Sequence, residues 1–257
     1  MVYQQLLPLT GERTVPGIDA ENYWFQRHLA VYQWIINQKL ATGEVLEAGC
    51  GEGYGAEMLR TSGCTVTAYD YDESVVDHVR SRYPQVEAMQ ANLDQLPASP
   101  DSFQAVVSLQ VIEHLWNLGG FLNECHRVTK SGGVVALSTP NRITFSPGVG
   151  RGEKPTNPFH VEEFDAEQMD LMMKTATFDN VQVYGLSHGP ALTELEAREG
   201  SLVQRQIDAV LAEESFSPQL LRSVSSVTSA DFEIARITPG SLAANTALDL
   251  IVTASKP

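Results

Sequence analysis

Three side chains of this sequence are of the types that acid–base or metal chemistry uses. Glu113 and His114 are adjacent in the segment QVIEHLWNL, and His160 follows in NPFHVEEF. An imidazole titrates near neutral pH, so either histidine could act as a general base that takes a proton from a hydroxyl group. The three side chains could instead bind a divalent cation such as Mg²⁺, which would lower the pKa of a coordinated hydroxyl. A third interpretation is structural: His114 packs beneath a strand and His160 anchors its loop.

A glycine-rich turn follows an apolar run in the segment VLEAGCGEGYGA, residues 45–56. Such a turn between a strand and a helix is typical of a nucleotide-binding unit. The spacing is GxGxG, and Tyr54 stands where a dinucleotide-binding fold needs a small residue. Glu47 lies inside the strand, where a carboxylate without a partner is costly. The ammonium group of a cofactor would be a suitable partner, whereas the pyrophosphate of a dinucleotide would be repelled.

Polar residues also follow the next two expected strands. Asp70 comes about twenty residues after Gly49, the interval at which an acidic side chain accepts hydrogen bonds from the hydroxyls of a ribose. Asn92 and Leu93 come after the third strand, where an amide side chain and a backbone N–H could read an adenine ring. The alternative is that Asp70 and Asn92 are ordinary turn residues.

The elements that must position these residues alternate between strand and helix. This alternation predicts an α/β fold with a parallel sheet and right-handed crossovers, in which the carboxyl ends of the strands share one edge. An amphipathic helix over 22–38 precedes the alternation, and residues 1–20 are expected to be irregular. We expect strands at 45–49, 65–70, 86–90, 103–110, 134–140, 181–186 and 248–255, and helices at 53–61, 73–82, 119–129 and 166–177.

The alternation stops between residues 187 and 229, where helical patterns recur at 203–211 and 217–226. We therefore expect three parts: an N-terminal segment with its helix (1–42), a cofactor-binding domain (43–186 plus 230–257) and a helical insertion (187–229). The insertion could shape an acceptor pocket or mediate a homodimer.

Composition narrows the class of partner. The net charge of −15, with only 17 lysines and arginines, disfavours nucleic acid and anionic membrane surfaces. The sequence contains no apolar run long enough for a membrane span and no secretory signal pattern. Its three cysteines have no metal-binding spacing. These features predict a cytoplasmic enzyme that acts on neutral small molecules.

Taken together, the segments EAGCGEG, NLDQLP, SFQAVVSLQVIEHL and SGGVVALSTPN resemble class I S-adenosylmethionine-dependent methyltransferases of the type 11-like group. The resemblance covers residues 43–186 and the closing strand. It implies a Rossmann-like seven-stranded fold of order 3-2-1-4-5-7-6, with strand 7 antiparallel and helices on both faces. It also implies S-adenosylmethionine as the cofactor.

The same resemblance assigns roles to residues at the sheet edge. It places Gly49, Gly51 and Gly53 against the methionine part of the cofactor and Glu47 near its amino group. Asp70 would hold the ribose, Asn92 and Leu93 would lie on either side of the adenine, and Gln110 would lie beside the cofactor. Cys50 and Tyr71 are expected to bind the cofactor as well. An EH pair with a later histidine also occurs in small-RNA 2′-O-methyltransferases, but these carry a glutamate at the place of Gln110, and similar acid/His sets occur in ubiquinone-pathway O-methyltransferases.

The N-terminal segment TGERTVPGIDAENYWFQRH is similar to the leading segment of actinobacterial methyltransferases associated with methylated polysaccharides. Aromatic and cationic residues gather there on one helix and predict a lid over the cofactor and a stacking wall for a sugar, with core packing as the alternative. They are Tyr23, Trp24, Arg27 and His28, and Trp116 could also face the acceptor. We therefore expect an O-methyltransferase acting on a sugar or oligosaccharide hydroxyl. Three alternatives are a quinone- or phenol-type acceptor, an NAD-linked dehydrogenase, and a non-catalytic protein that binds the cofactor for regulation.

Overall fold

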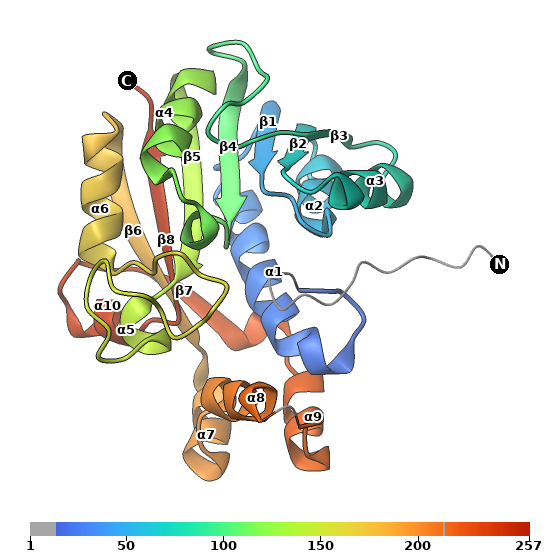
Figure 1. The fold of residues 1–257 in the computed structure, drawn as a ribbon, viewed down its shortest axis with the longest axis vertical. Helices are drawn as coiled ribbons and strands as arrows, with labels where there is room; N and C mark the ends of the chain where they lie inside the picture. Colours follow the sequence, from blue (N-terminus) through green and yellow to red (C-terminus); the bar gives the residue numbers. More distant parts are fainter. Residues whose placement is uncertain (1–13, 213) are drawn as a thin grey trace.

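The computed structural model describes residues 14–212 and 214–257 and has one mixed sheet at its centre (Figure 1). The strand order is β3-β2-β1-β4-β5-β8-β6-β7. Neighbouring strands from β3 to β5 pair in parallel, and β8 lies antiparallel between β5 and β6. The strands are β1 (Glu44–Ala48), β2 (Thr65–Asp70), β3 (Glu87–Gln90), β4 (Phe103–Leu109), β5 (Thr129–Pro140), β6 (Asp179–His188), β7 (Phe232–Arg236) and β8 (Asp249–Ser255).

The predicted Rossmann-like architecture is confirmed, with one correction to the sheet. The seven expected strands are present in the expected order, the last of them being β8, but an eighth strand, β7, pairs antiparallel with β6 at the edge. This strand has the sequence FEIAR, in which Glu233 and Arg236 are exposed. Charged residues are common on edge strands because they discourage pairing with other chains, and here they conceal the apolar pattern of a strand.

Helices cover both faces of the sheet because successive strand residues point to opposite sides. Val45 of β1 belongs to the core cluster under α1, α2 and α3, whereas Leu46 belongs to the cluster under α4 and α6. The helices are α1 (Asn22–Asn37), α2 (Tyr54–Thr61), α3 (Glu73–Arg82), α4 (Leu118–Val128), α5 (Arg142–Phe145), α6 (Ala166–Thr175), α7 (Pro190–Glu199), α8 (Leu202–Leu211), α9 (Pro218–Ser225) and α10 (Leu242–Thr246), with 3₁₀ turns η1 (Asp19–Glu21), η2 (Ile112–His114) and η3 (Ser229–Asp231).

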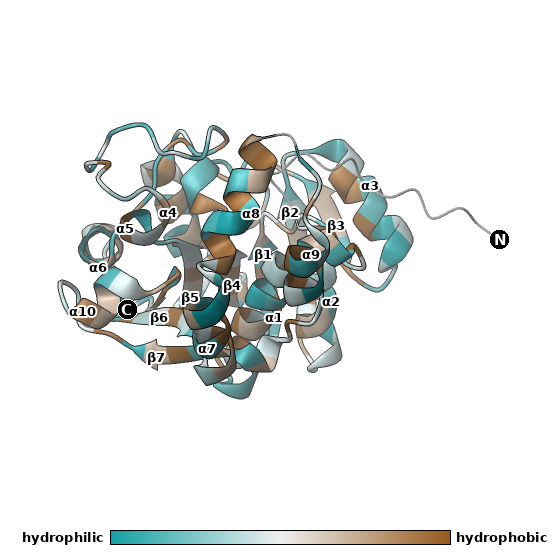
Figure 2. Cartoon of the chain, turned by 90° about the horizontal axis from the view of Figure 1, so that it is seen from below, coloured by the Kyte–Doolittle hydropathy of each residue, from teal (hydrophilic) through white to brown (hydrophobic). Residues whose placement is uncertain are grey.

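The segment between β6 and β7 contains three helices, one more than the sequence predicts. The unpredicted helix is α7, in which Leu192 is the one buried residue, so its apolar stripe is too short to recognise. In Figure 2, α8 carries both brown and teal bands, as expected for an amphipathic helix. The insertion is tied to the N-terminal helix by Asn22, whose amide donates to the carbonyls of Val224 and Val227 at 3.0 and 2.9 Å.

Of the segment 1–20 expected to be irregular, residues 1–13 lie outside the described residues, and the rest contains the start of η1. A capping box begins α6: the Asp165 side chain accepts from the Gln168 N–H at 3.0 Å. All three cysteines are free and buried. Within 14–212 and 214–257, none of the helices combines the length and apolar content of a membrane span.

Candidate active site

A cavity of about 1400 Å³ opens at the carboxyl ends of the parallel strands, the edge at which open α/β sheets bind ligands. Its lining joins the turn after β1 to the ends of β2, β3 and β4 and to the loop before α6. Most of the predicted site residues therefore meet at one place. Those that line the cavity are Gly49, Cys50, Gly51, Asp70, Tyr71, Asn92, Leu93, Gln110, His114, Trp116, His160 and His28.

The glycine-rich turn needs glycine for both backbone conformation and space. Gly49 has φ +80°, and a Cβ there would lie 2.5 Å from Cγ2 of Val111. Gly53 has φ +77°, and its Cβ would lie 2.7 Å from Val79 of α3. Gly49 and Gly51 line the cavity. Gly53 is not among the described residues that line it, and its role is to let the turn pack closely against α3.

Asp70 is held rigidly at the end of β2. Its Oδ2 accepts from the Gly51 N–H at 3.0 Å, and its Oδ1 accepts from the Asp72 N–H at 3.1 Å. These two bonds link the acidic residue to the glycine-rich turn and fix the carboxylate at the cavity wall. A rigid carboxylate is suited to accepting hydrogen bonds from a ribose because little of its freedom is lost on binding.

Glu47 lies behind the cavity wall and not in it. Its side chain is fully buried and accepts a hydrogen bond on Oε1 from the hydroxyl of Tyr32, a residue of α1 that does line the cavity. Burial raises the pKa of the Glu47 carboxyl to about 8. Its Oε2 has no hydrogen-bond partner within the described part of the chain. Sequence reasoning missed Tyr32 because its spacing on the helix also fits core packing.

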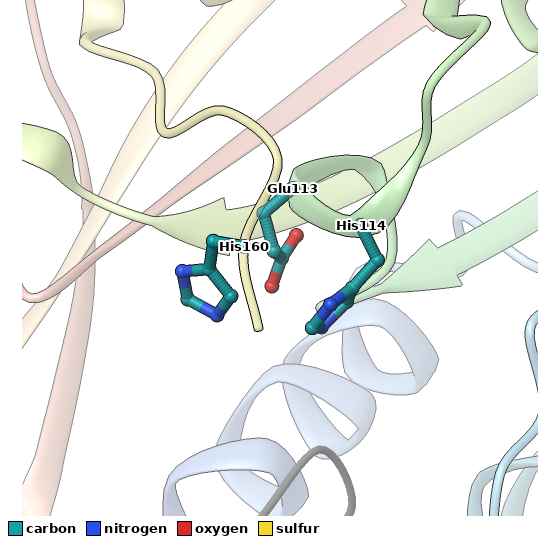
Figure 3. A group of neighbouring side chains, drawn as sticks. All are labelled: Glu113, His114 and His160. Carbon is teal, nitrogen blue, oxygen red and sulfur yellow. The ribbon is translucent and has the colours of Figure 1, made fainter. Parts of the chain in front are cut away.

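Glu113, His114 and His160 come together as predicted (Figure 3). One ligand atom from each lies within 4.8 Å of the other two, and the two imidazole rings meet edge-on with 5.0 Å between their centres. In Figure 3 the Glu113 carboxylate lies between the two rings. The loop that carries His160 is fixed to η2 because the carbonyl of Glu113 accepts from the Val161 N–H at 2.7 Å.

Neighbouring groups determine which atoms of His114 and Glu113 carry protons. Nδ1 of His114 lies 3.1 Å from the carbonyl oxygen of Phe159. A carbonyl can only accept, so the proton is on Nδ1 and the basic lone pair of the neutral ring is on Nε2. Burial raises the pKa of the Glu113 carboxyl to about 8, and Glu113 is absent from the cavity lining. His114 is therefore the member of the pair that reaches a ligand in the cavity.

Helix α1 forms a packed wall of the cavity, and only part of the predicted lid cluster faces it. His28 lines the cavity, with Nδ1 2.8 Å from the hydroxyl of Tyr54, and burial together with the charge of Arg27 lowers the pKa of His28 to about 3. Tyr23, Trp24 and Arg27 are not among the lining residues.

These three residues anchor the helix. The Tyr23 hydroxyl lies 2.6 Å from Nε2 of His188, and Arg27 pairs with Asp249 at 3.1 Å. The guanidinium of Arg27 also lies 4.8 Å from the ring centre of Trp24. The core-packing alternative therefore describes their position in this structure.

Several residues that line the cavity are not among the predicted site residues. They come chiefly from the loop between α5 and α6 and from the segment after η2, where polar and aromatic residues are interspersed. Asn117 caps α4 and donates to Asp94 at 2.8 Å, which brings two parts of the lining together. Others are Glu52, Lys154, Pro158 and Phe159. Phe159 could have been found from its position beside His160.

Comparisons with known proteins agree with this geometry. The family described as "Methyltransferase domain" matches residues 46–137. A Mycobacterium tuberculosis protein named "Probable S-adenosylmethionine-dependent methyltransferase" is 50% identical over 230 residues, which cover 89% of this chain and 82% of the relative. A Mycolicibacterium smegmatis relative with the same designation is 45% identical over 252 residues, which cover 98% and 96%. The crystal structure of a SAM-dependent methyltransferase from Thermotoga maritima has a TM-score of 0.62 at 16% identity, covering 91% of this chain and 92% of that one, and so shares the fold.

Proposed function

Since this chain belongs to the S-adenosylmethionine-dependent methyltransferases, we propose that it methylates a hydroxyl oxygen of a neutral small molecule, namely a sugar or oligosaccharide. The observation that carries the proposal is that one cavity contains both the glycine-rich turn and the imidazole of His114. The reaction belongs in the cytoplasm, where free thiols such as those of this chain persist. The family decides against the NAD-linked dehydrogenase that the glycine pattern alone leaves open.

The residues that would hold the cofactor lie in the half of the cavity between β1 and β3. Gly49 and Gly51 would let the backbone approach its methionine part, Asp70 would accept hydrogen bonds from its ribose, and Asn92 and Leu93 would flank its adenine. Glu47 acts on the cofactor's ammonium group through Tyr32, since the Tyr32 hydroxyl connects this buried carboxyl to the cavity. A carboxyl group behind the glycine-rich turn would repel phosphates, so this part of the cavity suits a cofactor that has none.

Methyl transfer needs alignment and removal of a proton. Bound S-adenosylmethionine would supply an electrophilic methyl group, and an acceptor hydroxyl held in line with its sulfur would take that methyl group and leave S-adenosylhomocysteine. The hydroxyl proton passes to Nε2 of His114, which the Phe159 carbonyl keeps basic by binding Nδ1–H. An alkyl hydroxyl is a weak acid, so this proton acceptor supplies a large part of the rate.

The residues in the other half of the cavity support a sugar as the acceptor. Trp116 is 90% exposed and Phe159 45% exposed, although both line the cavity, so two aromatic faces stand at its mouth. Aromatic rings pack against the apolar face of a sugar, while Asn117 and Asp94 offer hydrogen-bonding groups to its hydroxyls. A cavity of about 1400 Å³ also exceeds the roughly 300–1,000 Å³ of a site for one small ligand.

A divalent cation at Glu113, His114 and His160 is the second candidate mechanism, favoured by the approach of their ligand atoms to within 4.8 Å. The buried Oε2 of Glu113 has no hydrogen-bond partner among residues 14–212 and 214–257, and a cation there would supply one. Two imidazoles and one carboxylate suit Mn²⁺, Fe²⁺ or Zn²⁺ better than Mg²⁺, which prefers oxygen ligands. Such an ion would bind the acceptor hydroxyl and lower its pKa.

Binding of the cofactor is the first test. S-adenosylmethionine and S-adenosylhomocysteine, each at 100 times its Kd, should stabilise the protein by about 2.7 kcal/mol, a rise in Tm of roughly 5–10 °C by thermal shift. Asp70→Asn should weaken both affinities about 10- to 100-fold because a charged acceptor of the ribose hydroxyls is lost. Asp77→Asn, an exposed position on α3 outside the cavity, is the matched control. Stabilisation by NAD alone would refute the proposal.

Trp116→Ala tests the acceptor half. We expect KM for the acceptor to rise about 3- to 10-fold, since an aromatic contact contributes about 0.5–1.5 kcal/mol, with cofactor affinity and Tm unchanged. Release of S-adenosylhomocysteine is measured against methyl glycosides, oligosaccharides and substituted phenols. The control is Leu242→Ala on α10, which also removes a largely exposed apolar side chain and should leave KM unchanged. Turnover with phenols but not with sugars would show that the acceptor is of the quinone or phenol type and that the sugar assignment is wrong.

A further inference from the structure

A buried carboxylate to which the proposed mechanism gives no role lies directly behind His160. Glu163 is 1% exposed, and its Oε1 is 2.6 Å from Nδ1 of His160. Its Oε2 has no hydrogen-bond partner among residues 14–212 and 214–257. Burying a carboxylate costs several kcal/mol, so a side chain kept in this position calls for a specific reason.

Asn157 shows which nitrogen of His160 carries the proton. The Asn157 Oδ1 accepts from the Phe159 N–H at 3.0 Å, which fixes the amide so that its NH₂ group faces Nε2 of His160 at 3.0 Å. An N–H donor requires a lone pair on Nε2, and the Glu163 carboxylate requires a proton on Nδ1. Both contacts therefore assign the same tautomer, with Nδ1 protonated and Nε2 an acceptor.

His160 and His114 are therefore both protonated on Nδ1 and both carry the lone pair on Nε2. Both rings line the cavity, and their centres are 5.0 Å apart. The Asn157 amide occupies the position on Nε2 that a hydroxyl donor would take. At hydrogen-bond distances of about 2.8 Å, two neighbouring hydroxyls of one molecule can reach one ring each.

We propose that Glu163 is a positioning residue that holds His160 as an acceptor for the second hydroxyl of a vicinal diol, while the first hydroxyl faces His114. The diol displaces the Asn157 amide when it binds. Glu163 never touches the acceptor: its carboxylate keeps the proton on Nδ1 and orients the ring, as carboxylates do behind functional histidines. This inference rests on the proposed function. The acceptor that it requires is a 1,2-diol, a group found in both sugar rings and catechols.

The test combines NMR with kinetics. Glu163→Leu replaces the carboxylate by an apolar side chain of similar size, a change that buried sites tolerate. In protein labelled with ¹⁵N-histidine, long-range ¹⁵N–¹H spectra should show His160, assigned by the loss of its signals in His160→Gln, protonated on Nδ1 in the wild type and on Nε2 in Glu163→Leu. Glu163→Gln retains an oxygen acceptor and should keep the wild-type tautomer, and Glu162→Gln is the neighbouring control.

Turnover supplies the second readout. With catechol or a methyl glycoside as acceptor, Glu163→Leu should lower kcat/KM about 10- to 100-fold, whereas with phenol or a glycoside lacking the neighbouring hydroxyl it should change it less than threefold. The more responsive acceptor pair identifies the source of the diol. A wild-type His160 protonated on Nε2, or equal losses with diols and mono-hydroxyl acceptors, would overturn the inference. Failure of the proposed function is distinguishable, because calorimetry would then detect no S-adenosylmethionine binding in any variant while the tautomer remained readable.

Discussion

Replacing His114 by alanine is expected to lower the rate of methyl transfer about 10²- to 10⁴-fold, the usual contribution of a positioned general base. His114 lines the same cavity as the glycine-rich turn, and the Phe159 carbonyl holds the proton on Nδ1, which leaves the lone pair on Nε2. S-adenosylmethionine should bind the variant with nearly wild-type affinity, because its expected contacts lie between β1 and β3. The rate is measured in single turnovers as release of S-adenosylhomocysteine, and affinity by calorimetry.

The control is His126→Ala, a histidine of α4 outside the cavity, which should retain the wild-type rate. If His114→Ala is equally active, the general-base assignment is wrong. Exhaustive chelation then separates the two mechanisms that use His114. A base needs no ion, so activity should survive chelation, whereas the metal hypothesis requires that activity be lost and be restored by Mn²⁺ or Zn²⁺ but not in Glu113→Gln.

The positions of the residues expected to bind the cofactor were predictable because they follow from local rules. The carboxyl ends of parallel strands share one edge, so Gly49, Asp70 and Asn92 had to meet once the strands were recognised. The resemblance to a known family supplied the antiparallel strand, which alternation alone does not give. The pairing of Glu113 with His160 was also expected, because both follow strands that end at that edge.

The partners of the buried charges could not be predicted. Glu47 is paired by Tyr32 of a preceding helix, His160 by Glu163, and Arg27 by Asp249 at the other end of the chain. Helical spacing identifies which residues face inward but not which inward residue meets which, since that depends on how α1 crosses the sheet. The sequence therefore leaves two interpretations of the aromatic and cationic cluster on α1, a lid or core packing, and Tyr23 and Arg27 lie buried where α1 packs.

Replacing Arg27 by methionine should destabilise the protein by about 3–5 kcal/mol, the cost of leaving a buried carboxylate without its partner. Asp249 is fully buried, and burial raises the pKa of its carboxyl while Arg27 opposes the rise. Arg27 also lies 3.5 Å from Oε1 of Gln110, which lines the cavity at the end of β4. Loss of the Arg27 guanidinium therefore removes contacts that hold α1 next to the cavity.

The double variant Arg27→Met/Asp249→Leu distinguishes charge from packing. It removes both charges and should recover most of the stability, because apolar replacements of buried ion pairs are often neutral or better. Urea unfolding of the two single variants and the double variant gives the coupling free energy. The matched control is Arg80→Met on α3, whose partner Asp77 is 69% exposed and whose loss should cost no more than about 1 kcal/mol. If the double variant is as unstable as Arg27→Met, contact of the guanidinium with the rings of Trp24 and Phe145, and not its charge, holds α1 against the sheet.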